Sequence, residues 1–228
     1  MLGLISDIHA NLPALEAVLA DAKKRGVTDF LCLGDVVGYN GQPEDCVQLL
    51  RDEGARNILG NHDQYVTSGQ NCERSKVVAG IIDKHVAELS TDSIAWLAKS
   101  LDSVTDGETL FLHGGPQDHV DEYLYHVGQQ TFPEGIKRLF TGHTHVQCIL
   151  DFGSHLFCNP GSVGQPRDGD PRAAYALVSG DDVQLHRVEY DIDQTVQAMK
   201  DRGYEPFMYS GLYAGTQING RVDKIEKL

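Results

Sequence analysis

Short apolar runs alternate with longer amphipathic segments through the first sixty residues. Three runs have the length of a buried strand, at residues 2–5, 30–33 and 56–59. Between them, apolar side chains recur at helical spacing after Pro13 and after Pro43, and Gly26 and Gly54 follow where each pattern ends. Proline just inside a helix and glycine just past its end are common helix boundaries. The resulting β-α-β-α-β order predicts a mostly parallel sheet.

The remainder of the chain changes from helical to extended patterns. Residues 64–105 have a helical pattern, within which Ser90 has the position of a helix cap. After them, paired apolar runs around glycine-containing turns predict two β-hairpins, residues 147–152 with 155–159 and residues 173–178 with 183–190. We expect Asp193 to cap a last helix through Arg202, and the polar residues 217–228 to form a surface tail.

Length and composition favour one globular domain. With 228 residues and 41% hydrophobic content, we expect a single core and one domain over residues 1–228. No apolar run is long enough to span a membrane, and the first residues lack the basic start of a signal peptide, so they are predicted to form a strand. The five cysteines are scattered without a Cys-x-x-Cys pair, which indicates reduced, mostly buried thiols and a cytoplasmic protein.

The charge of the chain limits its partners. Lys and Arg number 19 against 33 Asp and Glu, a net charge of −14. Such a surface repels nucleic acids and anionic membranes, so we expect neither a broad nucleic-acid surface nor membrane binding. An anionic substrate would still bind where the site supplies its own positive charge, as bound divalent ions do. The sequence leaves the oligomeric state open, a homo-oligomer included.

Residues that bind metals stand directly after five successive predicted strands. Two of these strands are further apolar runs, at residues 110–112 and 138–141. The side chains are Asp7, His9, Asp35, Asn61, His113, His143 and His145. In open α/β sheets, ligands bind at the edge beyond the carboxyl ends of the strands. These donors suit Mn²⁺, Fe²⁺, Zn²⁺, Ni²⁺ or Mg²⁺, and the lack of cysteine among them argues against a structural zinc site.

Seven ligands are more than one ion needs. Two ions that share a carboxylate would use them all, and such a pair, about 3.5–4 Å apart, clamps the attacking and leaving oxygens of an in-line displacement. A water between them loses its proton near neutral pH, which supplies hydroxide without a protein nucleophile. The pattern therefore predicts two divalent ions, with Mn²⁺ favoured. P-loop NTPases and α/β-hydrolases are excluded, because neither Gly-x-x-x-x-Gly-Lys-Ser/Thr nor Gly-x-Ser-x-Gly is present.

The segments that carry these ligands resemble those of the calcineurin-like metallophosphoesterases, and among them the short bacterial phosphodiesterase-type members. The resemblance covers about residues 2–180 and rests on Ser6-Asp7-Ile8-His9-Ala10-Asn11, Leu33-Gly34-Asp35, Leu59-Gly60-Asn61-His62-Asp63, His113-Gly114-Gly115-Pro116, Gly142-His143-Thr144-His145 and Asn159-Pro160-Gly161-Ser162-Val163-Gly164. It implies an α/β fold (α+β in some schemes), with two mixed sheets packed as a sandwich, helices on the outside and the site at one edge. It also implies hydrolysis of phosphodiesters or phosphomonoesters.

The resemblance further implies a role for each residue. By motif position it implies a first ion held by Asp7, His9 and His145, a second held by Asn61, His113 and His143, and Asp35 bridging both. His62 would lie beside the substrate as general acid or as a stabiliser of transition-state charge, with Asp63 orienting its ring. Ala10 stands where the family usually has glycine, and it would cost about 1 kcal/mol if φ is positive there.

Several functions are compatible with this pattern. The leading hypothesis is a dinuclear phosphodiesterase that acts on a small phosphate ester. The alternatives are a phosphatase for phosphomonoesters, phosphoproteins or dinucleoside polyphosphates, and a non-catalytic scaffold. Residues 58–63 lack the Leu-Arg-Gly-Asn-His-Glu form typical of protein phosphatases. The presence of His62 together with all seven ligands argues against the scaffold.

Two arginines after the last metal-ligand motif have two interpretations each. Arg167 or Arg172 could bind a phosphate through both guanidinium nitrogens, or either could form a surface salt bridge to Asp168 or Asp170.

The residues around the other ligand clusters are also open to two interpretations. Tyr39 and Asn40 could line the substrate pocket, Tyr39 as a stacking face for a base, or could serve packing alone. The helical stretch 64–105 could roof the site or form a plain packing layer. We expect the remaining histidines to be surface or hydrogen-bonded side chains, namely His85, His119, His126, His155 and His186.

Overall fold

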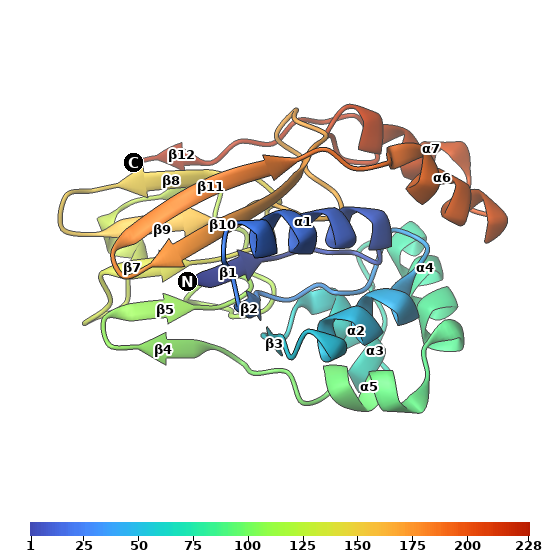
Figure 1. Cartoon of the computed structure of the whole chain (residues 1–228), viewed down its shortest axis with the longest axis horizontal. Coiled ribbons are helices and arrows are strands. Elements are labelled where there is room, and N and C mark those ends of the chain that lie inside the picture. Colours follow the sequence, from blue (N-terminus) through green and yellow to red (C-terminus); the bar gives the residue numbers. More distant parts are fainter.

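Two five-stranded mixed sheets form the centre of the molecule, which a computed structural model describes over residues 1–228 (Figure 1). The strands are β1 Leu2–Ile5, β2 Asp29–Cys32, β3 Arg56–Asn57, β4 Val104–Asp106, β5 Thr109–Phe111, β6 His126–Val127, β7 Arg138–Phe140, β8 Cys148–Asp151, β9 Leu156–Asn159, β10 Ala173–Ser179, β11 Asp182–Val188 and β12 Glu226–Lys227. The first sheet has the order β11-β10-β1-β2-β3 and the second β4-β5-β7-β9-β8, while β12 pairs with β6 alone. In each sheet three neighbouring strands are parallel, β1, β2 and β3 in one and β5, β7 and β9 in the other.

Seven α-helices surround these sheets. They are α1 Leu12–Lys24, α2 Pro43–Asp52, α3 Asn61–Ser68, α4 Lys76–Glu88, α5 Thr91–Leu97, α6 Ile192–Asp201 and α7 Pro206–Tyr209, with 3₁₀ turns η1 Gln129–Thr131 and η2 Ser210–Tyr213. Figure 1 shows α1 across the face of the first sheet and α2 to α5 gathered at one end of it. The predicted α/β sandwich of two mixed sheets flanked by helices is confirmed.

Local sequence signals set the ends of the first helices. The Asn11 side chain accepts a hydrogen bond from the amide of Ala14, which caps α1, and Gly26 beyond its end has a φ of 88°. Gly54 follows α2 with a φ of 64°. A left-handed backbone at such positions has no steric cost for glycine, so both predicted boundaries are confirmed. The predicted cap at Ser90 is also confirmed, because its side chain accepts from the amide of Ser93.

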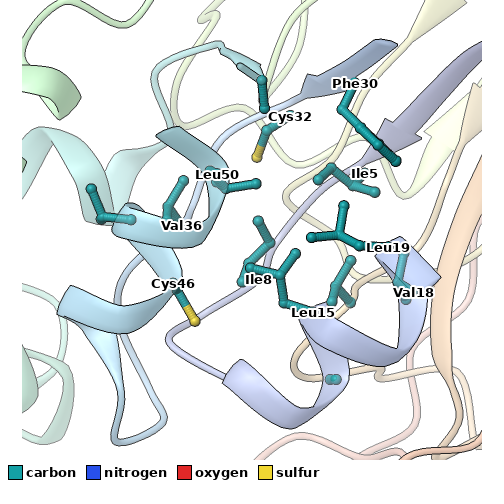
Figure 2. Packing of buried hydrophobic residues seen from close by; sticks show 14 of the residues in the cluster. Ile5, Ile8, Leu15, Val18, Leu19, Phe30, Cys32, Val36, Cys46 and Leu50 are labelled. Carbon is teal, nitrogen blue, oxygen red and sulfur yellow. The ribbon is translucent and has the colours of Figure 1, made fainter. Parts of the chain in front are cut away.

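The two-residue periodicity of the parallel strands divides the core into layers. On one face of the first sheet, Ile5, Phe30 and Cys32 pack against the buried sides of α1 and α2, as Figure 2 shows. On the opposite face, Leu4 and Leu31 belong to a smaller cluster with residues of the second sheet, including Phe140, so this cluster is the layer between the sheets. Because successive strand side chains point to opposite faces, short runs of consecutive apolar residues fill both layers.

Some predicted boundaries are wrong. Residues 64–105 are not helical throughout, because α5 ends at Leu97 and β4 begins at Val104. The last long helix is capped by Asp191 rather than by Asp193, since the Asp191 side chain accepts from the amide of Gln194. Both predicted hairpins are confirmed as the antiparallel pairs β8–β9 and β10–β11.

The polar residues 217–228 are held in place at several points. Their last strand, β12, pairs with β6, and Asp223 is 5% exposed. The main-chain amide of Asp223 donates to the carbonyl of Arg167 at 2.7 Å. The segment therefore lies at the surface, as predicted, but it is folded onto the domain rather than a free tail.

Two predictions from composition can be compared with the structure. All five cysteines are unpaired, three of them buried and two half-buried, in agreement with the prediction of reduced thiols. No helix is both long enough and apolar enough to cross a bilayer.

One buried histidine ties the loop after β2 to helix α4. His85 accepts a hydrogen bond from the amide of Gly38 through Nδ1, at 3.0 Å, and its Nε2 lies 2.8 Å from the carbonyl oxygen of Asn40. The same nitrogen lies 3.2 Å from the hydroxyl of Tyr204. This agrees with the expectation that His85 is a hydrogen-bonded side chain.

Protonation of His85 should reduce the stability of the fold. Burial lowers its pKa to about 4, although its hydrogen bond to Asn40 opposes the shift. The unfolded chain therefore binds the proton more readily between pH 6.5 and 4, and the free energy of unfolding falls as the pH falls through this window, by about 3 kcal/mol. In urea denaturation of metal-free protein, His85→Gln should lose less stability between pH 7 and pH 4 than wild type. His126→Gln, at an exposed position, is the control for the loss of an imidazole. If the free energy of unfolding of His85→Gln and of wild type fell equally between pH 7 and pH 4, His85 would not be the source of the pH dependence.

Candidate metal centre

The carboxyl ends of the parallel strands from both sheets bring the seven predicted ligands together. Asp7 and His9 follow β1, Asp35 follows β2, and Asn61 opens α3 just after β3. From the second sheet, His113 follows β5, and His143 and His145 follow β7. All seven side chains are at most 5% exposed. They form two groups compatible with metal binding, the first with Asp7, His9 and His145 and the second with Asp35, His113 and His143, and His62 forms a third such group with His9 and Asp35.

The first group surrounds a point between the loops after β1 and β7. Nε2 of His9 and Nε2 of His145 lie 3.1 Å apart. Oδ1 of Asp7 lies 3.2 Å from Nε2 of His145 and 3.8 Å from Nε2 of His9. The spacing is that of neighbouring ligands, because bonds of about 2.1 Å to one ion place adjacent donors about 3.0–3.4 Å apart.

The second group surrounds a point on the other side of Asp35. Nε2 of His113 lies 3.1 Å from Nδ1 of His143 and 3.3 Å from Oδ1 of Asn61. Oδ2 of Asp35 lies 3.5 Å from Nε2 of His113 and also 3.6 Å from Nε2 of His9. A single carboxylate oxygen thus faces both groups.

Backbone carbonyls fix the tautomers of three of these rings. Nδ1 of His9 lies 2.8 Å from the carbonyl of Val37, and Nδ1 of His113 lies 2.9 Å from the carbonyl of Leu33. Nδ1 of His145 bonds to a carbonyl at 2.6 Å in the same way. Since a carbonyl only accepts, each Nδ1 carries the proton, and the lone pair of the neutral ring is on Nε2. This outer hydrogen bond is the usual support of a metal-binding histidine.

The donor set fits a cation. The Nε2 lone pairs of His9 and His145 face each other at 3.1 Å with no proton between them when both rings are neutral, and this contact is repulsive unless a positive charge lies there. Oδ1 of Asp7 is buried and has no hydrogen-bond partner. A buried carboxylate oxygen in that state is costly unless a cation is close.

The charge interactions of Asp35 and His113 also favour a bound cation. Burial raises the pKa of Asp35, but the interaction with His113 leads the opposing effects of its neighbours, which hold the pKa well below the usual range. Burial opposes a charge on His113, yet the carboxylates of Asp35 and Asp7 raise its pKa to about 9. A metal ion that binds Nε2 of His113 would displace any proton there.

The loops around the group have a strained backbone. Positive φ angles outside glycine occur at seven positions, all in these loops, at Asp7, His9, Ala10, Asp35, Tyr39, His143 and His145. Five of the seven are predicted ligands. Such strain persists only where the surrounding structure enforces it, and it concentrates at functional sites. Ala10 has a φ of 54°, so the predicted cost of alanine in place of glycine applies.

His62 lies beside the first group, but Asp63 does not orient it. The ring centroid of His62 is 4.8 Å from that of His9, and its Nδ1 has no hydrogen-bond partner. Oδ1 of Asp63 instead accepts from the amides of Val36 and Val37, at 3.0 and 3.2 Å. The predicted contact is wrong because consecutive residues of a helix, here α3, project in different directions. Asp63 supports the loop that follows Asp35.

The two arginines have different environments. Arg167 is 5% exposed, and its guanidinium lies over the ring of Tyr39, 5.2 Å from the centroid. Its Nε is buried and has no hydrogen-bond partner. Arg172 forms an exposed ion pair with Asp170 at 2.6 Å, so of the two interpretations the salt bridge holds for Arg172 and the position beside the site holds for Arg167.

Tyr39 and Asn40 also have different environments. The Tyr39 ring is 4.6 Å from the ring of His9 and 4.8 Å from that of His62, beside the ligands. Asn40 is 1% exposed, and its side chain donates to the carbonyl of His9 at 2.8 Å. It therefore braces the ligand loop.

Two neighbours of the ligands were not predicted. The Tyr123 ring lies 3.8 Å from the ring of His143. It comes from the irregular segment after β5, where nothing in the sequence indicates a contact with the site. Ser6 donates to Oδ2 of Asp7 at 2.6 Å, and its only signal was its place next to Asp7 in the first motif.

Comparison with known proteins identifies the family. Residues 1–182 match the calcineurin-like phosphoesterase superfamily domain. The chain is 32% identical to MJ0912 of Methanocaldococcus jannaschii, over 94% of this chain and 98% of that protein. It is 30% identical to phosphodiesterase YfcE of Escherichia coli K12, over 77% of this chain and 85% of YfcE. The chain therefore belongs to the calcineurin-like phosphoesterases, a metal-dependent family, and is a phosphoric ester hydrolase.

Solved structures agree with this assignment. A metallophosphoesterase from Sphaerobacter thermophilus superposes with a TM-score of 0.82 at 34% identity, covering 94% of this chain and 99% of the other. PH1004 from Pyrococcus horikoshii superposes with a TM-score of 0.83 at 19% identity, covering 95% and 100%, which shows a shared fold. The predicted family is confirmed.

Gly60 should be required for the position of Asp35. A Cβ on Gly60 would overlap Oδ1 and the amide nitrogen of Asp35. We expect Gly60→Ala to displace this carboxylate and to weaken Mn²⁺ binding about 10- to 100-fold in calorimetric titration. Gly80→Ala in α4 is the matched control, because nothing lies within 4 Å of its new Cβ. Affinity equal to wild type in Gly60→Ala would show that this close approach does not matter.

Proposed function

We propose that this protein is a dinuclear-metal-dependent phosphodiesterase that hydrolyses a small substrate. The observation that carries the proposal is the position of Asp35, whose Oδ2 lies 3.6 Å from Nε2 of His9 and 3.5 Å from Nε2 of His113. Each of these nitrogens belongs to a separate convergent set of donors. A carboxylate shared in this way is typical of two-metal hydrolytic sites.

The proposed ligands follow from the two groups. A first ion would be held by Asp7, His9 and His145, a second by Asn61, His113 and His143, with Asp35 contacting both. Nitrogen and oxygen donors without thiolate favour Mn²⁺, with Fe, Zn, Ni or Mg as alternatives. When bound, the two ions supply Lewis acidity to the phosphate and lower the pKa of a water between them.

The proposed reaction adds water across one phosphorus–oxygen bond. The oxygen of water forms a new bond to phosphorus, the bond to the leaving oxygen breaks, and that oxygen takes up a proton. The products are a phosphomonoester and an alcohol. The residues of the chain serve to position the phosphate, exclude bulk water and stabilise the charge that develops.

His62 is the proposed stabiliser of that charge. Burial lowers its pKa to about 4, ahead of the opposite effect of Asp35, so the ring is neutral near pH 7 in the free protein. A neutral imidazole still donates one N–H hydrogen bond to a phosphate oxygen or to the leaving group. Of the two roles considered for His62, this favours charge stabilisation over transfer of a stored proton.

Arg167 and Tyr39 are the proposed substrate contacts next to the ligands. The Nε of Arg167 is buried without a hydrogen-bond partner in the protein, and its guanidinium is held by Oε1 of Gln165 at 2.8 Å and by the face of Tyr39. A fixed guanidinium suits a non-bridging phosphate oxygen. Asn40, also predicted as a substrate contact, is removed from this set by its role as a brace.

We propose further that residues 1–228 form one phosphoesterase domain and that the protein lies in the cytoplasm. The packing of residues 217–228 against β6 and Arg167 supports a single domain, and the five unpaired cysteines favour a reducing compartment. Phosphomonoesters, phosphoproteins and dinucleoside polyphosphates are the alternative substrates, and a panel of these compounds separates them from diesters.

Loss of the shared carboxylate should abolish hydrolysis. Asp35→Asn removes the negative charge that both groups face, so we expect hydrolysis of bis(p-nitrophenyl) phosphate with Mn²⁺ to fall at least 10³-fold, in line with the several kcal/mol that metal ions contribute. Asp29→Asn, at the exposed start of the same strand, is the matched control and should keep full activity. The proposal fails if wild-type protein is inactive with Mn²⁺, Fe²⁺, Ni²⁺, Zn²⁺ and Mg²⁺.

Removal of the His62 ring should slow the reaction without releasing the metals. His62→Ala is expected to lower kcat by about 10²–10⁴-fold, the usual contribution of such a side chain. Because its ring is not among the seven proposed ligands, the Mn²⁺ affinity measured by calorimetry should change less than in Asp35→Asn. Unchanged kcat in His62→Ala would exclude a role in the transition state.

A further inference from the structure

A cavity opens directly beside the ligand group and is bounded by parts of the chain that are distant in sequence. Its volume is about 470 Å³, within the range of small-molecule sites. Tyr39 and Arg167 line it on the side of the ligands, and Tyr123 and Tyr125 line it from the segment after β5.

Two of the lining tyrosines contact the histidines of the site. Tyr39 packs on His9 of the first group, with ring centroids 4.6 Å apart. Tyr123 packs on His143 of the second group, at 3.8 Å. A molecule in the cavity would therefore be separated from each ligand group by a single tyrosine ring.

The C-terminal segment supplies another wall, in addition to Ser75, Val77 and Val78 at the start of α4. Gln217, Ile218, Asn219 and Arg221 line the cavity, and the amide of Gln217 donates to the carbonyl of Arg221 at 2.9 Å to close a tight turn. These residues lie beyond residues 1–182, which match the family domain.

Asp223 holds this wall in place. It is 5% exposed, and its amide donates to the carbonyl of Arg167 at 2.7 Å. Its carboxylate accepts from the hydroxyl of Tyr125 at 3.4 Å and pairs with Nε of Arg221 at 2.7 Å. The wall is thereby joined to the arginine and the tyrosines on the other sides of the cavity.

The lining has the chemistry of a nucleotide site. The rings of Tyr123 and Tyr125 are stacked, 5.6 Å apart and within 10° of parallel, and Tyr123 is 41% exposed although it also packs on His143. The side-chain amide nitrogen of Asn219 has no partner within the protein, and only Nε of Arg221 is paired. Aromatic faces stack on bases, amides bind base edges, and guanidinium groups bind phosphate.

The charge of the cavity differs from that of the whole chain. Its lining includes Arg167 and Arg221 and no acidic side chain, whereas the chain carries a net charge of −14. Arg221 is paired with Asp223, so Arg167, which has no carboxylate partner, is the lining side chain whose charge favours an anion next to the ligand group.

We propose that the cavity binds the nucleoside part of a nucleotide phosphodiester, with the base on Tyr123 and with Asn219 and Arg221 as specificity-determining residues of the C-terminal wall. This proposal rests on the proposed phosphodiesterase function and names its substrate class. The scissile phosphate lies at the ligand group, and the nucleoside extends from it past Tyr39 and Arg167 into the cavity.

A pair of matched diesters tests the proposal. The p-nitrophenyl ester of thymidine 5′-monophosphate and methyl p-nitrophenyl phosphate release the same chromophore and differ only in the second group on phosphorus. Wild-type protein with Mn²⁺ should show a kcat/KM about 10- to 100-fold higher for the thymidine ester, the usual effect of stacking one base. The ratio of the two values is the measured quantity, because it cancels any general loss of activity.

Variants of the lining residues show which side chains cause the preference for the thymidine ester. Tyr123→Ala and Arg221→Gln should lower the ratio at least fivefold, and Tyr123→Phe, which keeps the ring, should restore most of it. Lys224→Gln is the matched control, since Lys224 is exposed in the same segment and does not line the cavity. As a readout independent of turnover, Tyr123→Ala should weaken calorimetric binding of thymidine 5′-monophosphate, but not that of inorganic phosphate.

The outcomes separate the two proposals. Absence of turnover for both esters would contradict the phosphodiesterase function, while the binding comparison would still test the cavity. Equal kcat/KM for the two esters in wild type would overturn the nucleotide proposal and leave the phosphodiesterase function standing. A thymidine preference that persists in both Tyr123→Ala and Arg221→Gln would overturn the assignment of the wall.

Discussion

The site depends on the Asp35 carboxylate being held between two sets of lone pairs. Its Oδ1 accepts from the amide of His62 at 2.8 Å, and its Oδ2 faces His9 on one side and His113 on the other. Without positive charge, such a concentration of buried acceptors would be unfavourable. The loops pack tightly around this carboxylate, so that a Cβ on Gly60 would overlap it.

The fold explains how ligands so distant in sequence meet. Parallel strands in each of two stacked sheets end at the same rim, and each ligand follows the strand that delivers it within a few residues. The turns that begin there have left-handed backbone at five of the seven ligands. Strain of about 1 kcal/mol or more per position is tolerated because two packed apolar layers determine the strand positions on both faces of the first sheet.

What the sequence predicted well was local. The placement of the seven side chains at strand ends, the cap at Ser90 and the two hairpins could be read from it because each depends on a few adjacent residues, whereas the cap expected at Asp193 lies at Asp191. The interpretation of Asp63 was wrong because adjacency in sequence does not produce contact on a helix, and Asp63 faces Val36 and Val37 instead. Tyr123 and the wall at residues 217–221 could not be predicted, since they reach the site only through tertiary packing and carry no motif.

Diffraction from crystals soaked in Mn²⁺, measured at the manganese absorption edge, would show whether two ions bind around the Asp35 carboxylate. We expect two anomalous peaks, one on either side of the Asp35 carboxylate, the first contacting His9 and the second His113. A single peak that leaves Asp35 uncoordinated, or no peak at full soaking concentration, would contradict the proposed dinuclear site.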